Sequence, residues 1–190
     1  PGVSYAFVEE DYPPRPLSGH RSSARLLGAV EGVISDTSFA QVYGHTKWVF
    51  GLWSGGRLLT RAEAGFTAID EIDTLPASVR FFAGGDTSVR GYAYKSLGPT
   101  DAFGSVVGGE NLLVGSIELD QQVAEEWSLA AFIDSGNAYD ELRDFNTATG
   151  VGVGIRWFSP LGPIRVDVAV PLEKDAPDDY RFHVTLGPDL

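Results

Sequence analysis

Hydrophobic residues alternate with small or polar residues along most of this chain, in stretches that are long for β-strands. From Gly150 to Phe158, GVGVGIRWF, valine, isoleucine and tryptophan occupy every second position, and glycine or arginine lies between them. Side chains of a β-strand point to opposite faces in turn, so each such stretch predicts a strand with one apolar face and one small or polar face. The many β-branched residues also favour strands over helices.

The alternation predicts roughly nine strands, most of them ten or more residues long. Strands of soluble sandwiches average about five to six residues, whereas a tilted strand that crosses a membrane needs about nine to eleven. This length favours a membrane barrel over a soluble β-sandwich binding module. The predicted strands span 3–10, 21–34, 39–53, 56–70, 109–123, 126–139, 149–158, 163–172 and 180–189.

The predicted connections alternate between short turns and long polar loops, as in outer-membrane barrels. Short turns are expected at 54–55, 124–125 and 159–163, and long loops at 71–108, 140–148 and 173–179. The 11–20 connection, DYPPRPLSGH, is the exception, because it lies at the short-turn end and is long. Bacterial up-and-down barrels have even strand numbers, and an open edge in lipid leaves backbone groups unpaired. We therefore expect an all-β, antiparallel up-and-down transmembrane barrel of which residues 1–190 form only a part.

Composition narrows the function classes further. The net charge of −12 argues against nucleic acid as a partner, because binding to phosphates needs clustered lysine and arginine. The absence of cysteine excludes disulfides and cysteine-ligated metal sites. No apolar run is close to the length of about 20 residues that a membrane-spanning helix needs. This criterion does not detect barrel strands, in which only every second residue faces lipid. The chain does not begin with methionine, so we expect a mature product or a fragment.

Aromatic residues are expected near the ends of the predicted strands, where a barrel carries its interfacial girdles. Each position alone fits an ordinary half-buried place in a sheet equally well, and only the joint pattern favours a girdle. The residues assigned to it are Trp48, Trp53, Trp127, Tyr139, Trp157 and Phe158.

The longest connection contains the glycine-rich segment FFAGGDTSVRGYAYKSLG, from Phe81 to Gly98. Taken alone, this segment fits a surface loop in which GGDTS forms turns. A phosphate-binding loop is disfavoured, because the Lys-Ser/Thr pair is missing and no helix follows. Long ordered loops in compact domains are usually functional, so we expect the 71–108 loop to enter the barrel lumen.

Three motifs carry a resemblance to a known superfamily. GGDTSVRGY, from Gly84 to Tyr92, resembles the GGxxSVRGY/F motif of the outer-membrane assembly barrels that include the TamA, BamA and two-partner secretion transporter families. GVGIRWFSPLGPIRVDVAVPL, at 152–172, resembles their second signature, and FIDSGNAY, at 132–139, resembles their F-x-D-x-G strand. The string FFAGGDTSVRGYAYKSLGP and the ending LGPDL are most similar to the TamA family. The resemblance implies a barrel of about 16 strands, within the range of bacterial barrels. On this resemblance residues 1–190 form its C-terminal part, and its first strands are expected outside this chain.

The resemblance also implies a role for the arginine of the motif. In this superfamily the long loop folds back into the barrel, and acids of the inner wall hold its arginine, here Arg90. By alternation Glu118 and Asp134 face the polar side of neighbouring strands, and a buried arginine needs such partners. We expect Arg90 to contact both, the alternative being that the two acids are unrelated lumen charges. The other assigned residues are Val89, Gly91 and Tyr92, with Gly84 and Gly85 as loop glycines that adopt positive φ.

The implied function is that of an assembly or insertion factor, not an enzyme, with no cofactor and no metal. Such TamA-like proteins lie in the bacterial outer membrane, help to insert unfolded autotransporter-type β-proteins into the lipid bilayer, and work with a TamB-like partner anchored in the inner membrane. Their substrate-receiving POTRA domains are expected outside this chain. The alternatives are a two-partner secretion transporter, a barrel anchor for a patatin-type enzyme, and a passive pore.

The remaining polar residues give weaker indications. The three histidines are too dispersed among the strands to indicate a metal site, and no G-x-S-x-G nucleophile motif occurs. The acidic residues within 173–179 could bind calcium, although a solvated external loop explains them more simply. By alternation Arg156, Arg165 and Asp167 face inward, and we assign them to a general lumen network.

Overall fold

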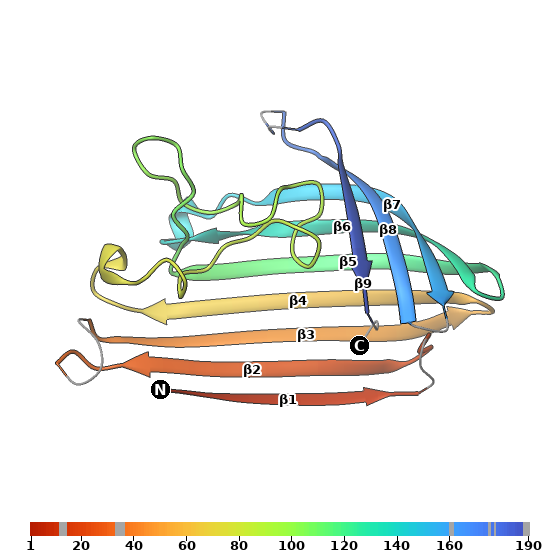
Figure 1. The fold of residues 1–190 in the computed structure, drawn as a ribbon, viewed down its shortest axis with the longest axis horizontal. Helices are drawn as coiled ribbons and strands as arrows, with labels where there is room; N and C mark the ends of the chain where they lie inside the picture. Colours follow the sequence, from red (N-terminus) through yellow and green to blue (C-terminus); the bar gives the residue numbers. More distant parts are fainter. Residues whose placement is uncertain (12–14, 33–36, 160–161, 175, 177, 188–190) are drawn as a thin grey trace.

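The computed structural model contains one antiparallel sheet of nine strands, in which each strand pairs with its neighbours in sequence (Figure 1). This order confirms the predicted all-β, up-and-down topology. The structure describes residues 1–11, 15–32, 37–159, 162–174, 176 and 178–187. The strands are β1 (Gly2–Glu10), β2 (Gly19–Ala29), β3 (Phe39–Trp53), β4 (Gly56–Ala68), β5 (Asn111–Ala124), β6 (Trp127–Tyr139), β7 (Ala148–Ser159), β8 (Gly162–Pro171) and β9 (Arg181–Leu186).

Helical structure is limited to two single turns of 3-10 helix in the long connections. These turns are η1 (Ile72–Thr74) and η2 (Leu142–Asp144). No helix in the described part of the chain has the length and hydropathy of a membrane span.

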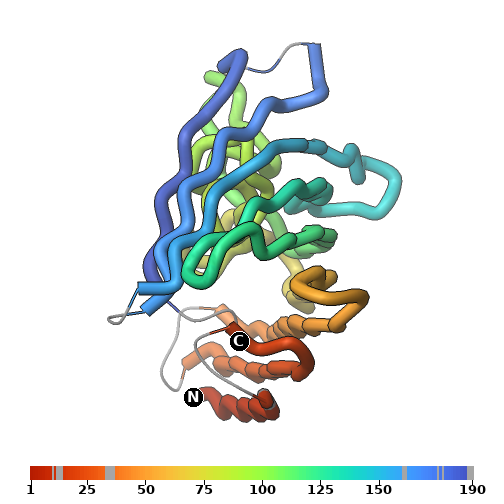
Figure 2. Tube along the Cα trace, turned by 90° about the vertical axis from the view of Figure 1, so that its right-hand side faces the viewer, coloured from red at the N-terminus to blue at the C-terminus, as the bar shows by residue number. Residues whose placement is uncertain are grey.

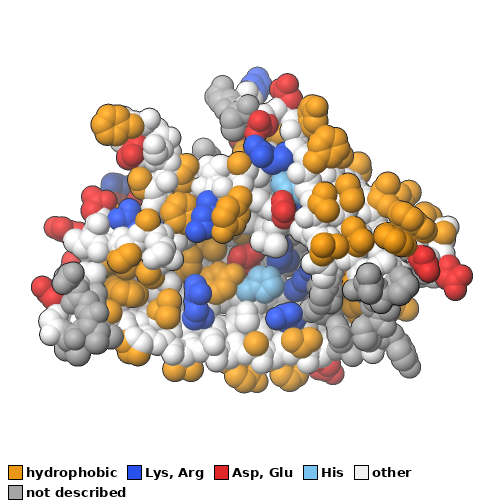
Figure 3. All heavy atoms as spheres, viewed as in Figure 1, with side chains coloured by type: hydrophobic (Ala, Val, Ile, Leu, Met, Phe, Trp, Pro, Cys, Tyr) orange, Lys and Arg blue, Asp and Glu red, His pale blue; other side chains and the backbone are white. Residues whose placement is uncertain are grey.

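Burial along the strands follows the period of two in the sequence. On β6, Leu129 and Ile133 are exposed on one face, whereas Phe132 and Asp134 are buried on the other. The same assignment holds for Val153 on β7, which is exposed as expected. The sheet thus has an apolar outer face, suited to lipid, and a small or polar inner face. Figure 3 shows part of the outer face as hydrophobic side chains gathered at the right of the view.

The two edge strands of the sheet are β1 and β9. The sheet is curled, and the long connection 69–110 lies inside the curl (Figure 2). Within the described residues β1 pairs only with β2, and β9 pairs only with β8. The β8–β9 ladder joins Ile164–Ala169 to Arg181–Leu186, and β9 has six residues where the other strands have nine to fifteen. The last strand is therefore held by the shortest ladder of the sheet.

Two strand ends differ from the prediction by more than two residues. The second strand ends at Ala29 and not at 34, because the chain turns and Gly32 adopts a φ of 78°, a conformation that interrupts an extended strand. The ninth strand ends at Leu186, where Gly187 has a φ of 131°. Of the predicted residues beyond these ends, 33–34 and 188–189 lie outside the described part of the structure.

The long connection at the short-turn end folds across the ends of the strands. Arg57 on β4 donates a hydrogen bond to the carbonyl of the buried Pro16, at 2.9 Å, and pairs with Asp120 on β5 at 3.1 Å. Arg15 binds the same Asp120 at 2.8 Å. The connection between β1 and β2 is longer than a simple turn, and its described part contributes one ion pair and one buried hydrogen bond at this end of the sheet.

The aromatic girdle is only partly as predicted. Trp127 and Trp157 are exposed on the outer face, and their rings stack with centroids 5.8 Å apart. Phe158 was assigned to the girdle, and this assignment is wrong. Its side chain is buried on the inner face, where Arg15 and Arg57 lie 5.8 and 5.5 Å from its ring centroid. Because side chains alternate along a strand, Phe158 points to the face opposite to that of Trp157. The position of Phe158 near a strand end was therefore a misleading signal.

Candidate functional site

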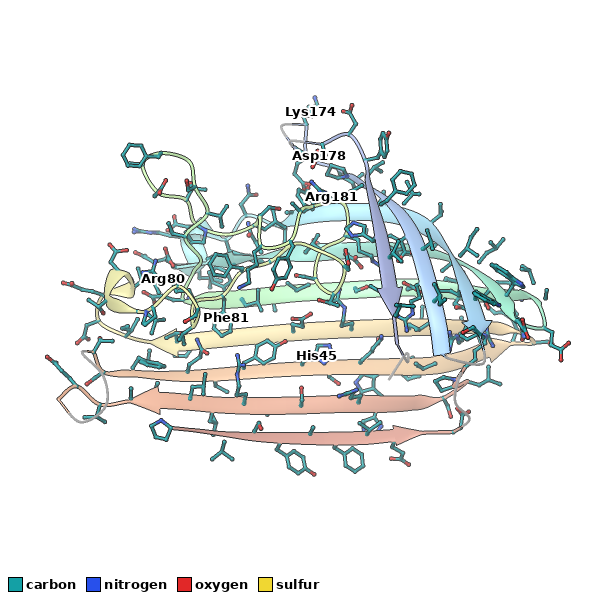
Figure 4. All side chains as sticks on the ribbon, viewed as in Figure 1. His45, Arg80, Phe81, Lys174, Asp178 and Arg181 are labelled. Atoms are coloured by element: carbon teal, nitrogen blue, oxygen red, sulfur yellow. The ribbon has the colours of Figure 1, made fainter. Side chains whose placement is uncertain are left out.

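The connection 69–110 forms a compact body that packs against the inner wall of the sheet. Isolated bridges join Phe81 to Gly109 and Ala83 to Leu97, which folds the connection back on itself. Phe81 lies over β4, where a Cβ atom on Gly65 would come within 2.4 Å of its ring (Figure 4). The buried apolar cluster shared by the connection and the wall contains Phe81, Ala83, Val89, Tyr92, Leu112, Val114, Ala138 and Ala148.

Residues 84–92, GGDTSVRGY, are called the motif loop below. Its three glycines have φ values of 94° at Gly84, 105° at Gly85 and 99° at Gly91. Gly84 is also tightly enclosed, because a Cβ atom there would lie 2.5 Å from the carbonyl oxygen of Ala93. These conformations are accessible to glycine and strained for other residues, so the glycines determine the path that presents Arg90 to the wall.

Arg90 lies at the centre of the site and is only 7% exposed. Its Nε and Nη2 donate to the two oxygens of Asp134 at 2.7 and 3.0 Å. Its Nη1 donates to Glu118 at 2.8 Å and to Asp167 at 3.1 Å. The hydroxyl of Ser116 donates to Asp134 at 2.5 Å. The structure thus brings Arg90 together with the two acids selected from the sequence, and adds a third.

A second buried arginine completes the network. Arg156 on β7 donates to Glu118 at 2.9 Å and to Asp167 at 2.6 Å. Sequence reasoning placed Arg156 and Asp167 on the inner face but left them in a general lumen network, because alternation identifies a face and not a partner across the lumen. We call Arg90, Glu118, Asp134, Arg156 and Asp167 the Arg90 cluster.

The Arg90 cluster contains two positive and three negative charges, all buried. Burial alone disfavours a charged guanidinium. The hydrogen bonds to Asp134 and the negative charge of Glu118 outweigh that effect, so the pKa of Arg90 lies above its ordinary value. Removing one partner of a buried pair typically costs about 3–5 kcal/mol, because the remaining charge is left uncompensated. The cluster therefore holds the motif loop firmly to β5, β6 and β8.

An aromatic ring supports the guanidinium from the wall. The Cζ atom of Arg90 lies 3.3 Å from the ring centroid of Phe132 on β6, a cation–π arrangement in a buried place. The ring of Phe132 fits only because residue 152 on the neighbouring strand is glycine, since a Cβ atom on Gly152 would lie 2.4 Å from the ring. The predicted F-x-D-x-G strand thus supplies two contacts to Arg90, the ring of Phe132 and the carboxylate of Asp134.

Glycines at every second position of β7 make room for these groups. A Cβ atom on Gly150 would lie 1.8 Å from the carbonyl oxygen of Arg90, and one on Gly154 would lie 1.8 Å from Asp167. Together with Gly152 they form an inner stripe without side chains. The alternation GVGVG, which first indicated a strand, is therefore also the seat of the motif loop.

The opposite side of the motif loop is held by β4 and β9. Arg61 on β4 donates to the backbone carbonyls of Thr87 and Ser88. On β9, the Nε2 of His183 accepts a hydrogen bond from the backbone N–H of Gly91 at 3.0 Å, and its Nδ1 is paired with Asp86. His183 was not selected from the sequence, because its partners are 92 and 97 residues away in the chain. The inward position of His183 on the last strand was the only signal.

A cavity of about 750 Å³ lies between the motif loop and the inner faces of β2, β3 and β4, and residues of β5, β8 and β9 also line it. His45 points into it from β3, and Lys and Arg side chains surround it in the space-filling view (Figures 3 and 4). Its basic lining residues are Arg21, His45, Lys47, Arg61, Arg90 and Arg165. No group of side chains suited to hold a metal ion is found within the described residues.

Comparison with known proteins gives a consistent result. The outer membrane protein assembly factor BamA of Nitratidesulfovibrio vulgaris is 30% identical over 123 residues, which is 60% of this chain and 16% of that protein. BamA of Neisseria meningitidis serogroup B is 29% identical over an alignment of 203 residues, covering 85% of this chain and 26% of that protein. The chain thus spans about a quarter or less of the length of these relatives.

A solved structure has the same fold. The crystal structure of BamA from Haemophilus ducreyi lacking POTRA domains 1–3 aligns with a TM-score of 0.77 at 23% identity, over 98% of this chain and 42% of that one. The Omp85 superfamily domain matches residues 2–189. Since this match covers nearly the whole sequence, the chain belongs to the Omp85 superfamily of bacterial outer-membrane proteins.

Proposed function

We propose that this chain is the C-terminal part of the barrel of an outer-membrane assembly factor, which inserts other β-proteins into the membrane. The observation that carries the proposal is the short pairing of the last strand, β9. β9 pairs with β8 over six residues and has no other strand partner within the described residues. Its outer face, with Phe182 and Val184, is apolar and exposed. The most weakly held strand of the sheet is thus the one at its C-terminal edge.

Such an edge can receive a substrate strand. An extended segment that adds to a sheet edge gains main-chain hydrogen bonds, and in lipid each unpaired backbone group would cost several kcal/mol. In the complete barrel β9 would form one side of the seam between the first and last strands. Opening of this seam lets a substrate strand exchange partners without exposing its backbone to hydrocarbon. The reaction needs no cofactor, because no covalent bond changes.

Within the superfamily we assign the chain to the TamA type. The support is the string FFAGGDTSVRGYAYKSLGP with the ending LGPDL. On this proposal POTRA domains and the first strands precede residue 1, a TamB-like protein is the partner, and autotransporter-type proteins are the substrates. Complementation tests this choice. The complete protein should restore autotransporter assembly in a strain lacking TamA, and should not restore growth of a strain depleted of BamA. The reverse pattern would contradict the TamA assignment.

Crosslinking tests the seam. Residues 1–190 contain no cysteine, so a single cysteine placed among them is unique in this part of the protein. In membranes that hold the complete protein and an arrested β-barrel substrate, a cysteine at Val184 on β9 should crosslink to substrate. A cysteine at Ile133, equally outward on β6 but far from either edge strand, is the matched control. Equal crosslinking at both positions would contradict insertion at the seam.

A further inference from the structure

His183 is the point at which the motif loop and the last strand meet. It is the third residue of β9, and its side chain is buried, with 3% of the residue exposed. Its Nε2 accepts from the N–H of Gly91 at 3.0 Å, and its Nδ1 contacts the carboxylate of Asp86. Within the described residues, both hydrogen bonds between the connection 69–110 and β9 pass through this one ring.

The two contacts fix the proton of the imidazole. A backbone N–H can only donate, so Nε2 of His183 must be the acceptor and the ring proton must lie on Nδ1. The Nδ1–H group then donates a hydrogen bond to the carboxylate of Asp86. The neutral ring therefore accepts one hydrogen bond from the loop and donates another to it. Both hydrogen bonds are lost if the ring moves away with β9.

The remainder of the motif loop is anchored elsewhere. Arg90 is tied by ion pairs to Asp134 on β6, Glu118 on β5 and Asp167 on β8. Asp167 lies directly opposite His183 in the β8–β9 ladder. Asp167 on β8 thus holds the loop by an ion pair, and its neighbour His183 on β9 holds the loop by hydrogen bonds. A movement of β9 away from β8 breaks the β8–β9 ladder and the two hydrogen bonds of His183, and it leaves the ion pairs between the loop and the wall in place.

We propose that His183 is a positioning residue that couples the motif loop to the last strand, so that β9 can leave β8 only when its bonds to Gly91 and Asp86 break. The inference rests on the proposed function, because it concerns the opening of the seam. The two hydrogen bonds of His183, called the latch below, hold β9 to the motif loop while the seam is closed. A pair of hydrogen bonds through a neutral ring is weaker than the ion pairs of the Arg90 cluster, so β9 is released before the loop is.

Hydrogen exchange measured on the complete protein in detergent or liposomes, without substrate, tests the coupling. His183→Phe keeps a ring and removes both hydrogen bonds. We expect the amides of residues 181–186 and those of the motif loop to exchange roughly five- to 150-fold faster, the effect of losing about two hydrogen bonds. Thr185→Val is the matched control, because Thr185 faces inward two residues along β9 and makes no side-chain hydrogen bond in the described part of the chain. It should leave both segments unchanged.

A variant in the loop gives the decisive result. Within the described residues, Asp86 makes its one hydrogen bond to β9 through His183, and its side chain is 45% exposed, so Asp86→Ala, which removes the acceptor of the Nδ1–H, should fold normally. If the latch exists, Asp86→Ala speeds exchange in β9, although the substitution is in the loop. Unchanged exchange in β9 for Asp86→Ala, or faster exchange in β9 alone for His183→Phe, would overturn the coupling. If the exchange results hold and the wild-type protein assembles no substrate, the latch stands and the proposed function fails.

Discussion

The two halves of the sheet have the same alternating strands but different interiors. In β5–β8 the inner face is closed by the motif loop, and five charged side chains are paired there away from water. In β1–β4 the inner face carries basic side chains that line an open cavity, and every described side chain of β1 is exposed. Alternation alone therefore specifies which face is polar. Whether that face becomes a rigid, buried network depends on what packs against it.

The largest expected effect breaks the closed half. Arg90→Ala should destabilise the complete barrel by about 3–5 kcal/mol, because three buried carboxylates lose their shared cation. Arg90→Lys should recover only part of this, since lysine lacks the planar fork that binds both oxygens of Asp134. Resistance to urea and heat measures the loss. Arg21→Ala, in the exposed lining of the other half, should change stability by no more than about 0.5 kcal/mol. Similar losses for the alanine variants of Arg90 and Arg21 would contradict the comparison.

A smaller effect is expected from filling the glycine stripe. Gly150→Ala should cost about 1–3 kcal/mol, because its new methyl group would meet the carbonyl of Arg90 and push the motif loop off the wall. Gly44→Ala on β3 is the matched control, since its nearest neighbour would be 4.0 Å away. The midpoint of urea unfolding measures both variants. If Gly150→Ala were as harmless as Gly44→Ala, the loop would not be seated on β7 as described.

A double-mutant cycle sharpens the comparison within the closed half. Arg90→Ala and Asp134→Ala should show a coupling free energy of about 0.5–3 kcal/mol, because the two side chains share two hydrogen bonds. The same cycle between Arg90 and Arg21, which share no contact, should be additive within about 0.3–0.5 kcal/mol. Additivity of the first pair would show that the ion pair contributes nothing beyond its separate parts.

The smallest expected effect is on the outer face of the same strands. Trp127 and Trp157 stack there with both rings exposed. Trp157→Leu should cost about 0.5–1.5 kcal/mol, the usual contribution of an aromatic pair beyond its buried area. Thermal unfolding in liposomes measures it. A loss as large as that of Arg90→Ala would mean that the lipid-facing surface, and not the interior, controls the stability of this half.

The fold and the centre of the site could be predicted, and the remainder could not, for identifiable physical reasons. Period-two alternation fixed the strands and their faces, and the motif resemblance pointed to Arg90 with Glu118 and Asp134. The partners that were missed, above all Asp167 and His183, lie on strands that meet the motif loop only because the sheet curls. Alternation contains no information about curvature, so it gave their inward direction and not their contacts.

One consequence of the Arg90 cluster concerns time and not stability. Arg90 follows the first four strands, but its partners Glu118, Asp134 and Asp167 are 28, 44 and 77 residues further along the chain. Contacts so distant in sequence form late and slowly. While the chain is being made or transported, the Arg90 cluster stays incomplete until Asp167 on β8 arrives, and the loop has no hydrogen bond to β9 until His183 does. The inner face of this sheet is therefore closed in stages, as β5 to β9 follow the motif loop along the chain.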